Sequence, residues 1–168
     1  MSYKLQLKQD MKLAPLLKED NHILKRRKNT AIRLIASIIS QQLSTKVAKI
    51  IFDRFLDLYQ GKEPSCEQVM AMDPTVLRSI GLSNAKVAYV KNVAHFFLDQ
   101  KITDKQLYKM EPEAVIELLT QIIGVGRWTV EMLLMFSLGR EDVFAVDDLG
   151  IQQAMTKLYN LDSTNKKQ

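Results

Sequence analysis

Gly124 and Gly126 stand on either side of Val125, between two segments that have the apolar spacing of helices. Glycine allows backbone conformations that are closed to other residues, and it leaves the tip of a turn without side chains. The backbone N–H groups at the start of the next helix, which opens at Arg127, then point outward where a phosphate can approach. Such a hairpin binds a sugar-phosphate backbone without reading its base sequence. A tight turn in a helical protein explains these three residues alone equally well.

Helices must position this hairpin, because helix signals fill almost the whole chain. Apolar residues recur at three- and four-residue spacing over residues 31–43 and again over 47–59. Arg127 opens a helix predicted to continue to Leu138, and a last amphipathic helix is predicted from about Asp148 to Leu158. Capping residues or an N-terminal proline mark the remaining helix starts, at Ser65, Asp73-Pro74, Ser83, Thr103 and Glu111-Pro112.

Strand signals are nearly absent from the chain. The only apolar run without helical spacing, residues 143–146, is interpreted as a buried extended connector. We therefore expect an all-α fold of seven to nine short helices, in one domain that spans residues 1–168. Cys66 is predicted to be a half-buried helix residue, His95 a helix-face residue and His22 a surface residue.

Composition narrows the classes of partner. The chain has 24 Lys and Arg against 19 Asp and Glu, a formal net charge of +5, which favours a polyanionic partner. A single cysteine excludes an intramolecular disulfide and any cluster or zinc site built from several cysteines of this chain, and it favours a reducing compartment. No signal peptide and no apolar run long enough to span a bilayer is recognisable, so we expect an intracellular, soluble protein without a membrane partner.

Two segments resemble the helix-hairpin-helix DNA glycosylase superfamily, namely Ile123-Gly124-Val125-Gly126-Arg127-Trp128-Thr129 and Asp142-Val143-Phe144-Ala145-Val146-Asp147-Asp148-Leu149-Gly150-Ile151. Residues 10–16, residues 37–44 and the segment Ile80-Gly81-Leu82-Ser83 followed by Lys86 are most similar to its 3-methyladenine DNA glycosylase II branch. The resemblance implies a compact helical glycosylase fold with a helix-hairpin-helix over about 112–138 and a groove between two helical lobes. It also implies a DNA-repair enzyme that releases alkylated purines of the 3-methyladenine and 7-methylguanine type from double-stranded DNA.

The resemblance implies that an aspartate beyond the hairpin helix projects into the base pocket and is catalytic. Asp147 and Asp148 are both candidates, and Asp148 is favoured because the apolar Ile151 follows it at the spacing of the family. Its carboxylate would stabilise positive charge on the sugar and orient a water molecule. Asp148 also suits the N-cap of the last helix. If one residue does not serve both roles, Asp147 is the cap and Asp148 the functional group.

Trp128 occupies the hairpin position at which the lyase branches of the superfamily have a lysine. An indole has no amine to attack the sugar, so the resemblance implies a monofunctional enzyme that uses water and leaves an intact abasic site. The ring would stack on the extruded, cationic base. The alternative role for Trp128 is an anchor of the core.

Further contacts follow from the same resemblance. Gln42 is the implied wedge that fills the gap left by the extruded base, although the pair Gln41-Gln42 equally suits a plain helix end. The implied cofactor set is empty except for a monovalent cation, Na⁺ or K⁺, on the backbone carbonyls of Thr120, Ile122 and Val125. The full set of expected DNA-binding residues is Gly124, Val125, Gly126, Arg127, Thr129, Gln41, Gln42 and Ser44.

Two other functions compete with the enzyme. A helix-hairpin-helix module that binds DNA without catalysis needs no aspartate pair, and a helical protein-interaction domain explains neither the hairpin nor Trp128. The basic cluster Lys25-Arg26-Arg27-Lys28 suits a phosphate contact and a solvated face equally well. The chain ends soon after the aspartate helix, whereas the branch usually continues with one or two more helices, so we expect a truncated or unusually short member. We expect a monomer in a bacterial cytoplasm or a nucleus.

Overall fold

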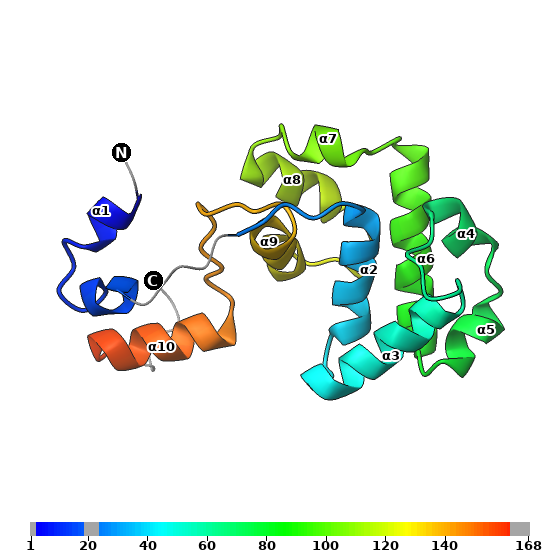
Figure 1. Cartoon of the computed structure of the whole chain (residues 1–168), viewed down its shortest axis with the longest axis horizontal. Helices are drawn as coiled ribbons and strands as arrows, with labels where there is room; N and C mark the ends of the chain where they lie inside the picture. Colours follow the sequence, from blue (N-terminus) through cyan, green and yellow to red (C-terminus); the bar gives the residue numbers. More distant parts are fainter. Residues whose placement is uncertain (1–2, 19–23, 162–168) are drawn as a thin grey trace. The chain divides into compact units, whose positions relative to one another are not determined.

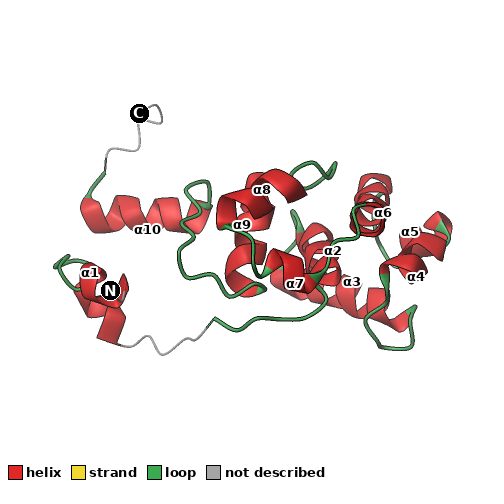
Figure 2. Ribbon diagram, turned by 90° about the horizontal axis from the view of Figure 1, so that it is seen from above, coloured by secondary structure: helices red, strands yellow, loops and turns green. Residues whose placement is uncertain are grey.

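The computed structural model describes residues 3–18 and 24–161, and it divides the chain into two compact units. The larger unit is Leu24–Val143; the described part of the smaller unit consists of residues 3–18 and 144–161. Helices, turns and loops account for all described residues, with no strand among them (Figure 2). The predicted all-α class is confirmed.

The larger unit contains eight α-helices, whose bounds are α2 Thr30–Ser40, α3 Thr45–Asp57, α4 Cys66–Ala71, α5 Pro74–Ser79, α6 Asn84–Asp99, α7 Asp104–Leu107, α8 Pro112–Leu119 and α9 Arg127–Phe136. The predicted capping boxes at Ser65 and Thr103 are both present. Asp73 caps α5 through the Thr75 N–H, as its place before a proline predicted. Helix α9 is two residues shorter than predicted, because the Leu138 N–H turns back to the Leu133 carbonyl.

Helix α2 lies at the centre of the larger unit and packs against α3, α6 and α9 (Figure 1). Its apolar residues Ile32, Leu34, Ile35, Ile38 and Ile39 are fully buried. Helix α6 covers another side of α2 and carries α4 and α5 on its far side. Thr30 at the start of α2 is buried, whereas Ser40 at its end is exposed.

The smaller unit contains α1 (Tyr3–Leu7), a 3-10 helix, η1 (Ala14–Lys18), and α10 (Leu149–Tyr159). The described chain thus has ten α-helices, more than the seven to nine predicted, because α1 is too short to show apolar periodicity. No residue of α10 is fully buried. Two contacts join the N-terminal segment of the smaller unit to α10. The Tyr159 hydroxyl donates to Asp10 Oδ2 at 2.6 Å, and Lys12 Nζ lies 5.0 Å from the centre of the Tyr159 ring.

The connector before α10 differs from its prediction. Only Ala145 is buried, whereas Phe144 and Val146 are 58% and 56% exposed. Alternate residues of an extended chain face opposite sides, so one face of the run is buried and the other is not.

The remaining predictions concern single residues. Cys66 is half-buried on α4 as predicted, and burial raises the pKa of its thiol to about 11. His95 lies exposed on α6, as predicted, whereas His22 lies outside the described residues. None of the helices that the structure describes is long and apolar enough to cross a membrane.

Candidate nucleic-acid interface and active site

The turn between α8 and α9 is a tight hairpin with an exposed tip. Ile122 and Val125 are buried on either side of the tip, and the Val125 N–H donates to the Ile122 carbonyl at 3.0 Å. Ile123 between them is 73% exposed. The two buried side chains hold the turn against the larger unit and leave its backbone at the surface.

Gly124 is required by both backbone conformation and space. Its φ of +100° lies in the left-handed region that favours glycine. A Cβ built on Gly124 would lie only 2.2 Å from Cγ of Tyr89, a residue of α6. The hairpin therefore rests directly on the Tyr89 ring, and any side chain at Gly124 would push it away.

The start of α9 presents backbone donors. Gly126 is the N-cap and, within the part of the chain that the structure describes, no side chain caps this helix. The first N–H groups of an α-helix have no carbonyl partner in the helix, and the helix dipole makes this end attractive to anions. A Cβ at Gly126 would meet no atom within 4 Å, so the space in front of it is open. This geometry suits a phosphate.

The Arg127 side chain is 49% exposed, and two carboxylates are paired with its guanidinium. Its guanidinium binds the Glu113 carboxylate through two nitrogens at 2.7 Å each, and its Nε lies 3.1 Å from Glu131 Oε1. The hydrogen bond from Arg127 holds the pKa of Glu113 below its ordinary value. The same bond is the main cause of the raised pKa of Arg127. The pair ties α8 to α9, and the expected DNA contact of Arg127 stays a prediction.

Thr129 and Val125 are also turned inward, at 3% and 5% exposure. The Thr129 hydroxyl accepts a hydrogen bond from Gln41 Nε2 at 3.4 Å. Their predicted DNA contacts are therefore restricted to the backbone, because burial removes both side chains from any ligand.

The loop of residues 41–43, which joins α2 to α3, lies against the hairpin. Gln41 is half-buried, and its Nε2 donates to the Gly124 carbonyl at 3.4 Å as well as to Thr129. Gln42 is exposed and has a left-handed backbone, with a φ of 59°. Ser44 caps α3 through the Val47 N–H at 3.4 Å and is exposed. Gln41 thus joins the two segments, whereas Gln42 remains available to a ligand.

Three residues on one face of α6 support both segments, and no sequence motif assigns a role to any of them. Lys86 Nζ donates to the carbonyls of Ile39 and Gln41, at 2.8 Å each. Tyr89 lies beneath Gly124, and Asn92 Nδ2 donates to the Ile123 carbonyl at 3.2 Å. The signal in the sequence was their spacing of three, which places large polar side chains on one helix face.

Trp128 occupies the second position of α9 and is 41% exposed. It does not belong to the buried core, so the alternative of a core anchor is wrong. A large indole with two-fifths of its area accessible, one residue from the phosphate-binding geometry, suits a stacking surface.

Asp148 in the smaller unit is the N-cap of α10, and its Oδ1 accepts the Ile151 N–H at 2.9 Å. The alternative in which Asp147 is the cap is therefore wrong. Asp148 is half-buried, whereas Asp147 is exposed. The cap orients the carboxylate through its hydrogen bond to the helix backbone.

The predicted cation site consists of backbone carbonyl oxygens. Residues 3–18 and 24–161 contain no group of three or more His, Cys, Asp or Glu side chains placed to hold a metal ion. Of the three carbonyls predicted to hold a monovalent cation, that of Ile122 already accepts the Val125 N–H. A carbonyl oxygen has two lone pairs, so this bond leaves capacity for one further ligand.

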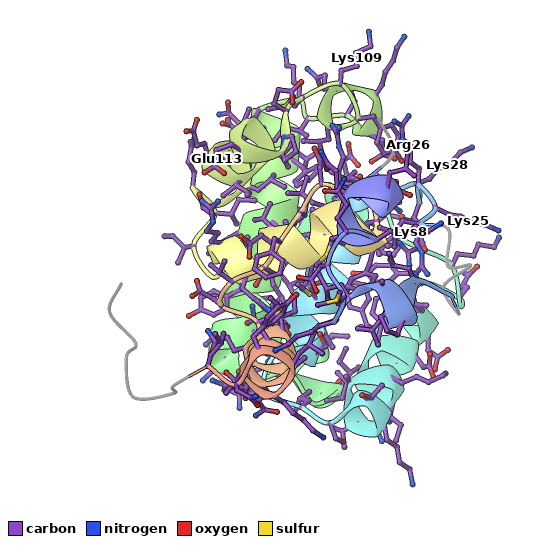
Figure 3. The ribbon with its side chains drawn as sticks, turned by 90° about the vertical axis from the view of Figure 1, so that its left-hand side faces the viewer. Lys8, Lys25, Arg26, Lys28, Lys109 and Glu113 are labelled. Atoms are coloured by element: carbon purple, nitrogen blue, oxygen red, sulfur yellow. The ribbon has the colours of Figure 1, made fainter. Side chains whose placement is uncertain are left out.

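The basic cluster Lys25-Arg26-Arg27-Lys28 lies at the other end of α2 from the hairpin. Its four side chains are exposed. Two hydrogen bonds hold the backbone of this segment: the Arg27 N–H donates to the Ser137 carbonyl, and the Tyr108 hydroxyl donates to the Arg27 carbonyl. Figure 3 shows Lys25, Arg26 and Lys28 on one side of the larger unit and Glu113 on the opposite side. Since α2 has 11 residues, its length of roughly 16 Å separates the cluster from Gln41.

Comparisons with known proteins find similarity to DNA repair proteins. A family model described as HhH-GPD superfamily base excision DNA repair protein matches residues 35–168. DNA-3-methyladenine glycosylase 1 of Schizosaccharomyces pombe is 42% identical over 130 residues, which cover 76% of this chain and 57% of that protein. DNA-3-methyladenine glycosylase of Saccharomyces cerevisiae is 35% identical over 167 residues, which cover 90% of this chain and 56% of that protein.

A solved structure agrees with these relatives. Schizosaccharomyces pombe 3-methyladenine DNA glycosylase in complex with abasic DNA matches with a TM-score of 0.83 and 35% sequence identity, over 95% of this chain and 81% of that one. The chain spans 57% and 56% of the lengths of the two relatives, which is less than two thirds of each.

Proposed function

Because the chain belongs to the HhH-GPD superfamily of base excision DNA repair proteins, we propose that it releases alkylated purines from double-stranded DNA. The proposed substrates are of the 3-methyladenine and 7-methylguanine type, and the names of the relatives, both DNA-3-methyladenine glycosylases, support the first of these. The observation that carries the proposal is the hairpin, with its open α9 N-terminus in front of Gly126 and the exposed Trp128 beside it. Glycosylases extrude the target base from the duplex before they cleave it, so both a phosphate grip and a stacking surface are needed.

In the proposed reaction the bond between the sugar and the base breaks and its electron pair leaves with the base. An N-alkylated purine is cationic before cleavage, so departure neutralises it and requires no strong general acid. Positive charge develops on the sugar, and the carboxylate of Asp148 stabilises it. Water then attacks the anomeric carbon and gives up a proton, for which the same carboxylate is the acceptor. The product is a free base and an intact abasic site.

Monofunctional chemistry is supported by Trp128. A lyase needs an amine that forms a Schiff base with the sugar, and the indole at this hairpin position has none. A monovalent cation on the Thr120, Ile122 and Val125 carbonyls would add to the positive potential at the hairpin. The Ile122 carbonyl oxygen accepts the Val125 N–H and has a second lone pair, which supports this part of the proposal. Replacing K⁺ by a bulky organic cation tests it, because duplex affinity then falls if such an ion is bound.

The proposal includes the oligomeric state and the cell compartment of the protein. One copy of the hairpin binds through its own backbone groups, so a monomer suffices, and light scattering of the protein on duplex DNA tests that stoichiometry. We propose a bacterial cytoplasm or a nucleus as its compartment, because both contain DNA.

The decisive experiment compares release of free base from methylated duplex DNA by the wild type, Asp148→Asn and Asp147→Asn. Asparagine is an N-cap nearly as good as aspartate, so Asp148→Asn removes the charge and keeps the start of α10. We expect it to lower the rate by about 100-fold to 1,000-fold, the size typical of one lost electrostatic contact to the transition state. Asp147→Asn serves as the matched control and stays within about twofold, as is usual for an exposed polar substitution.

Three results of this experiment would contradict the proposed function, and each differs from the others. No release by the wild type, with salt-sensitive duplex binding intact, would identify the competing DNA-binding module. Release that persists in Asp148→Asn and disappears in Asp147→Asn would move the catalytic role to Asp147. Strand cleavage by the wild type would contradict the monofunctional chemistry.

A further inference from the structure

We propose that Lys86 is a positioning residue for base extrusion, because its ammonium group holds the 41–43 loop in the conformation that presents Gln42 to the duplex. This inference rests on the proposed function, since it assigns Gln42 to the gap that the extruded base leaves. Lys86 itself is half-buried beneath the loop and has no direct role in the chemistry.

The first step is the pair of bonds at the end of α2. Lys86 Nζ lies 2.8 Å from the Ile39 carbonyl oxygen and 2.8 Å from that of Gln41. The last carbonyls of a helix have no intrahelical partner, and the helix dipole places negative potential there. The ammonium group satisfies two acceptors at once, and both lie within three residues of Gln42.

The second step is the backbone of Gln42. The Gln41 carbonyl belongs to the peptide unit that joins Gln41 to Gln42, so fixing its oxygen fixes the plane from which the φ of Gln42 is measured. That φ is 59°, in a region that residues other than glycine seldom adopt and that persists only where neighbours hold it. Lys86 is the charged side chain that bonds to this peptide unit.

The third step connects the loop with the hairpin. The Gln41 side chain donates to the Gly124 carbonyl, Tyr89 lies beneath Gly124, and Asn92 holds the Ile123 carbonyl. Lys86, Tyr89 and Asn92 lie on one face of α6, so a single rigid helix sets the spacing between the hairpin and Gln42. A wedge that is misplaced by about 1 Å loses much of its effect on a reaction that depends on orientation.

Lys91 provides a matched control within the same helix. Its Nζ donates to the Met70 and Met72 carbonyls, at 2.6 and 2.5 Å, and so closes the end of α4 as Lys86 closes the end of α2. Both lysines are half-buried, and burial lowers the pKa of each ammonium group. Loss of either lysine therefore removes two carbonyl bonds from a helix end, but only Lys86 reaches the 41–43 loop.

The test measures single-turnover release of 7-methylguanine from two duplexes, one with the lesion opposite cytosine and one with it opposite adenine. A mismatched base is extruded at lower cost, so it depends less on the wedge. We expect Lys86→Met to lower the rate on the matched duplex about 10-fold to 100-fold and that on the mismatched duplex less than about threefold. Lys91→Met lowers both rates equally, and Lys86→Arg, which keeps the charge, restores part of the difference.

Two outcomes overturn the inference. In the first, Lys86→Met and Lys91→Met lose thermal stability to a similar degree and both keep the wild-type ratio of matched to mismatched rates. The second is measured on the DNA-free protein, so it also applies when the wild type releases no base and the proposed function itself fails. The amide resonances of the DNA-free protein then decide, because unchanged Gln42 resonances in Lys86→Met would show that Lys86 does not hold the loop.

Discussion

Different interactions stabilise the interior of each of the two units. In the larger unit, α2 buries five large apolar side chains completely and its neighbours α3, α6 and α9 cover them. In the smaller unit, α10 has no fully buried residue, and its described link to the N-terminal segment is the Tyr159–Asp10 hydrogen bond and the Lys12–Tyr159 contact. Burial of apolar area is the dominant source of stability, so the unit that bears the hairpin is the more stable one. The candidate catalytic carboxylate belongs to the less stable one.

The largest effect is expected where the larger unit is most crowded. Gly124→Ala combines a left-handed φ with a Cβ only 2.2 Å from the Tyr89 ring, so it should cost about 4 kcal/mol, roughly half from backbone strain and half from overpacking. Gly126→Ala is the matched control, since its Cβ would meet no atom within 4 Å. Urea unfolding measures both variants. Equal stability of the two would mean that the hairpin does not rest on α6.

The same pair separates folding from binding. Gly126→Ala leaves the fold intact but places a methyl group in front of the α9 N-terminus. We expect its duplex affinity to fall by about 1 kcal/mol, the size of a hydrogen bond lost or lengthened. Fluorescence anisotropy with a labelled duplex checks this result, and unchanged affinity would remove the phosphate from this position.

A leucine deletion in each unit tests the comparison directly. Leu134 in α9 is completely buried, so Leu134→Ala should cost about 3 kcal/mol through lost burial and the cavity that remains. Leu158 in α10 is only half-buried, and Leu158→Ala should cost below about 1 kcal/mol. Denaturant midpoints of the two variants provide the measurement. A cost at Leu158 as large as that at Leu134 would contradict the difference between the units.

The smallest effect concerns the polar link of the smaller unit. The hydrogen bond from the Tyr159 hydroxyl is the main cause that lowers the pKa of Asp10 below its ordinary value of 3.8. A carboxylate whose folded pKa is lowered contributes stability above its unfolded pKa and loses it as the pH falls through the folded value. In Tyr159→Phe we expect the Asp10 pKa to rise towards 3.8, and an NMR titration of the carboxyl carbon measures it. An unchanged pKa would show that this bond does not form in solution.

Much of the fold was predictable because its signals are local. Helix periodicity, the capping boxes at Ser65 and Thr103 and the glycines of the hairpin each act within a few residues. The family resemblance carried by the hairpin and the aspartate segment is confirmed by the family match. The supports of the site were not predictable in the same way. Lys86 meets a carbonyl 47 residues earlier in the chain, and the partner of Arg127 lies 14 residues before it on another helix.

The roles of single residues were also only partly predictable from local sequence patterns. The sequence pattern indicated that an aspartate caps α10 but placed Asp147 there as one option, and the structure assigns the cap to Asp148. Thr129 and Val125 match the motif, yet both side chains face inward, because a motif records residue identity and not the direction of a side chain. The connector of residues 143–146 was predicted as buried, and its alternate exposure depends on tertiary neighbours that no local pattern contains.

The ion pair across the hairpin has a consequence for the proposed contact with DNA. Residues 120–129 contain one charged side chain, Arg127, and Glu113 and Glu131 neutralise it. Binding that neutralises few phosphates with cations releases few counterions, so such a contact weakens little as salt rises. In the proposed complex, the contact of this hairpin with the damaged strand therefore depends on the direction of its hydrogen bonds. On the same proposal, ionic strength acts on duplex binding through exposed cations elsewhere, such as Lys25 and Lys28.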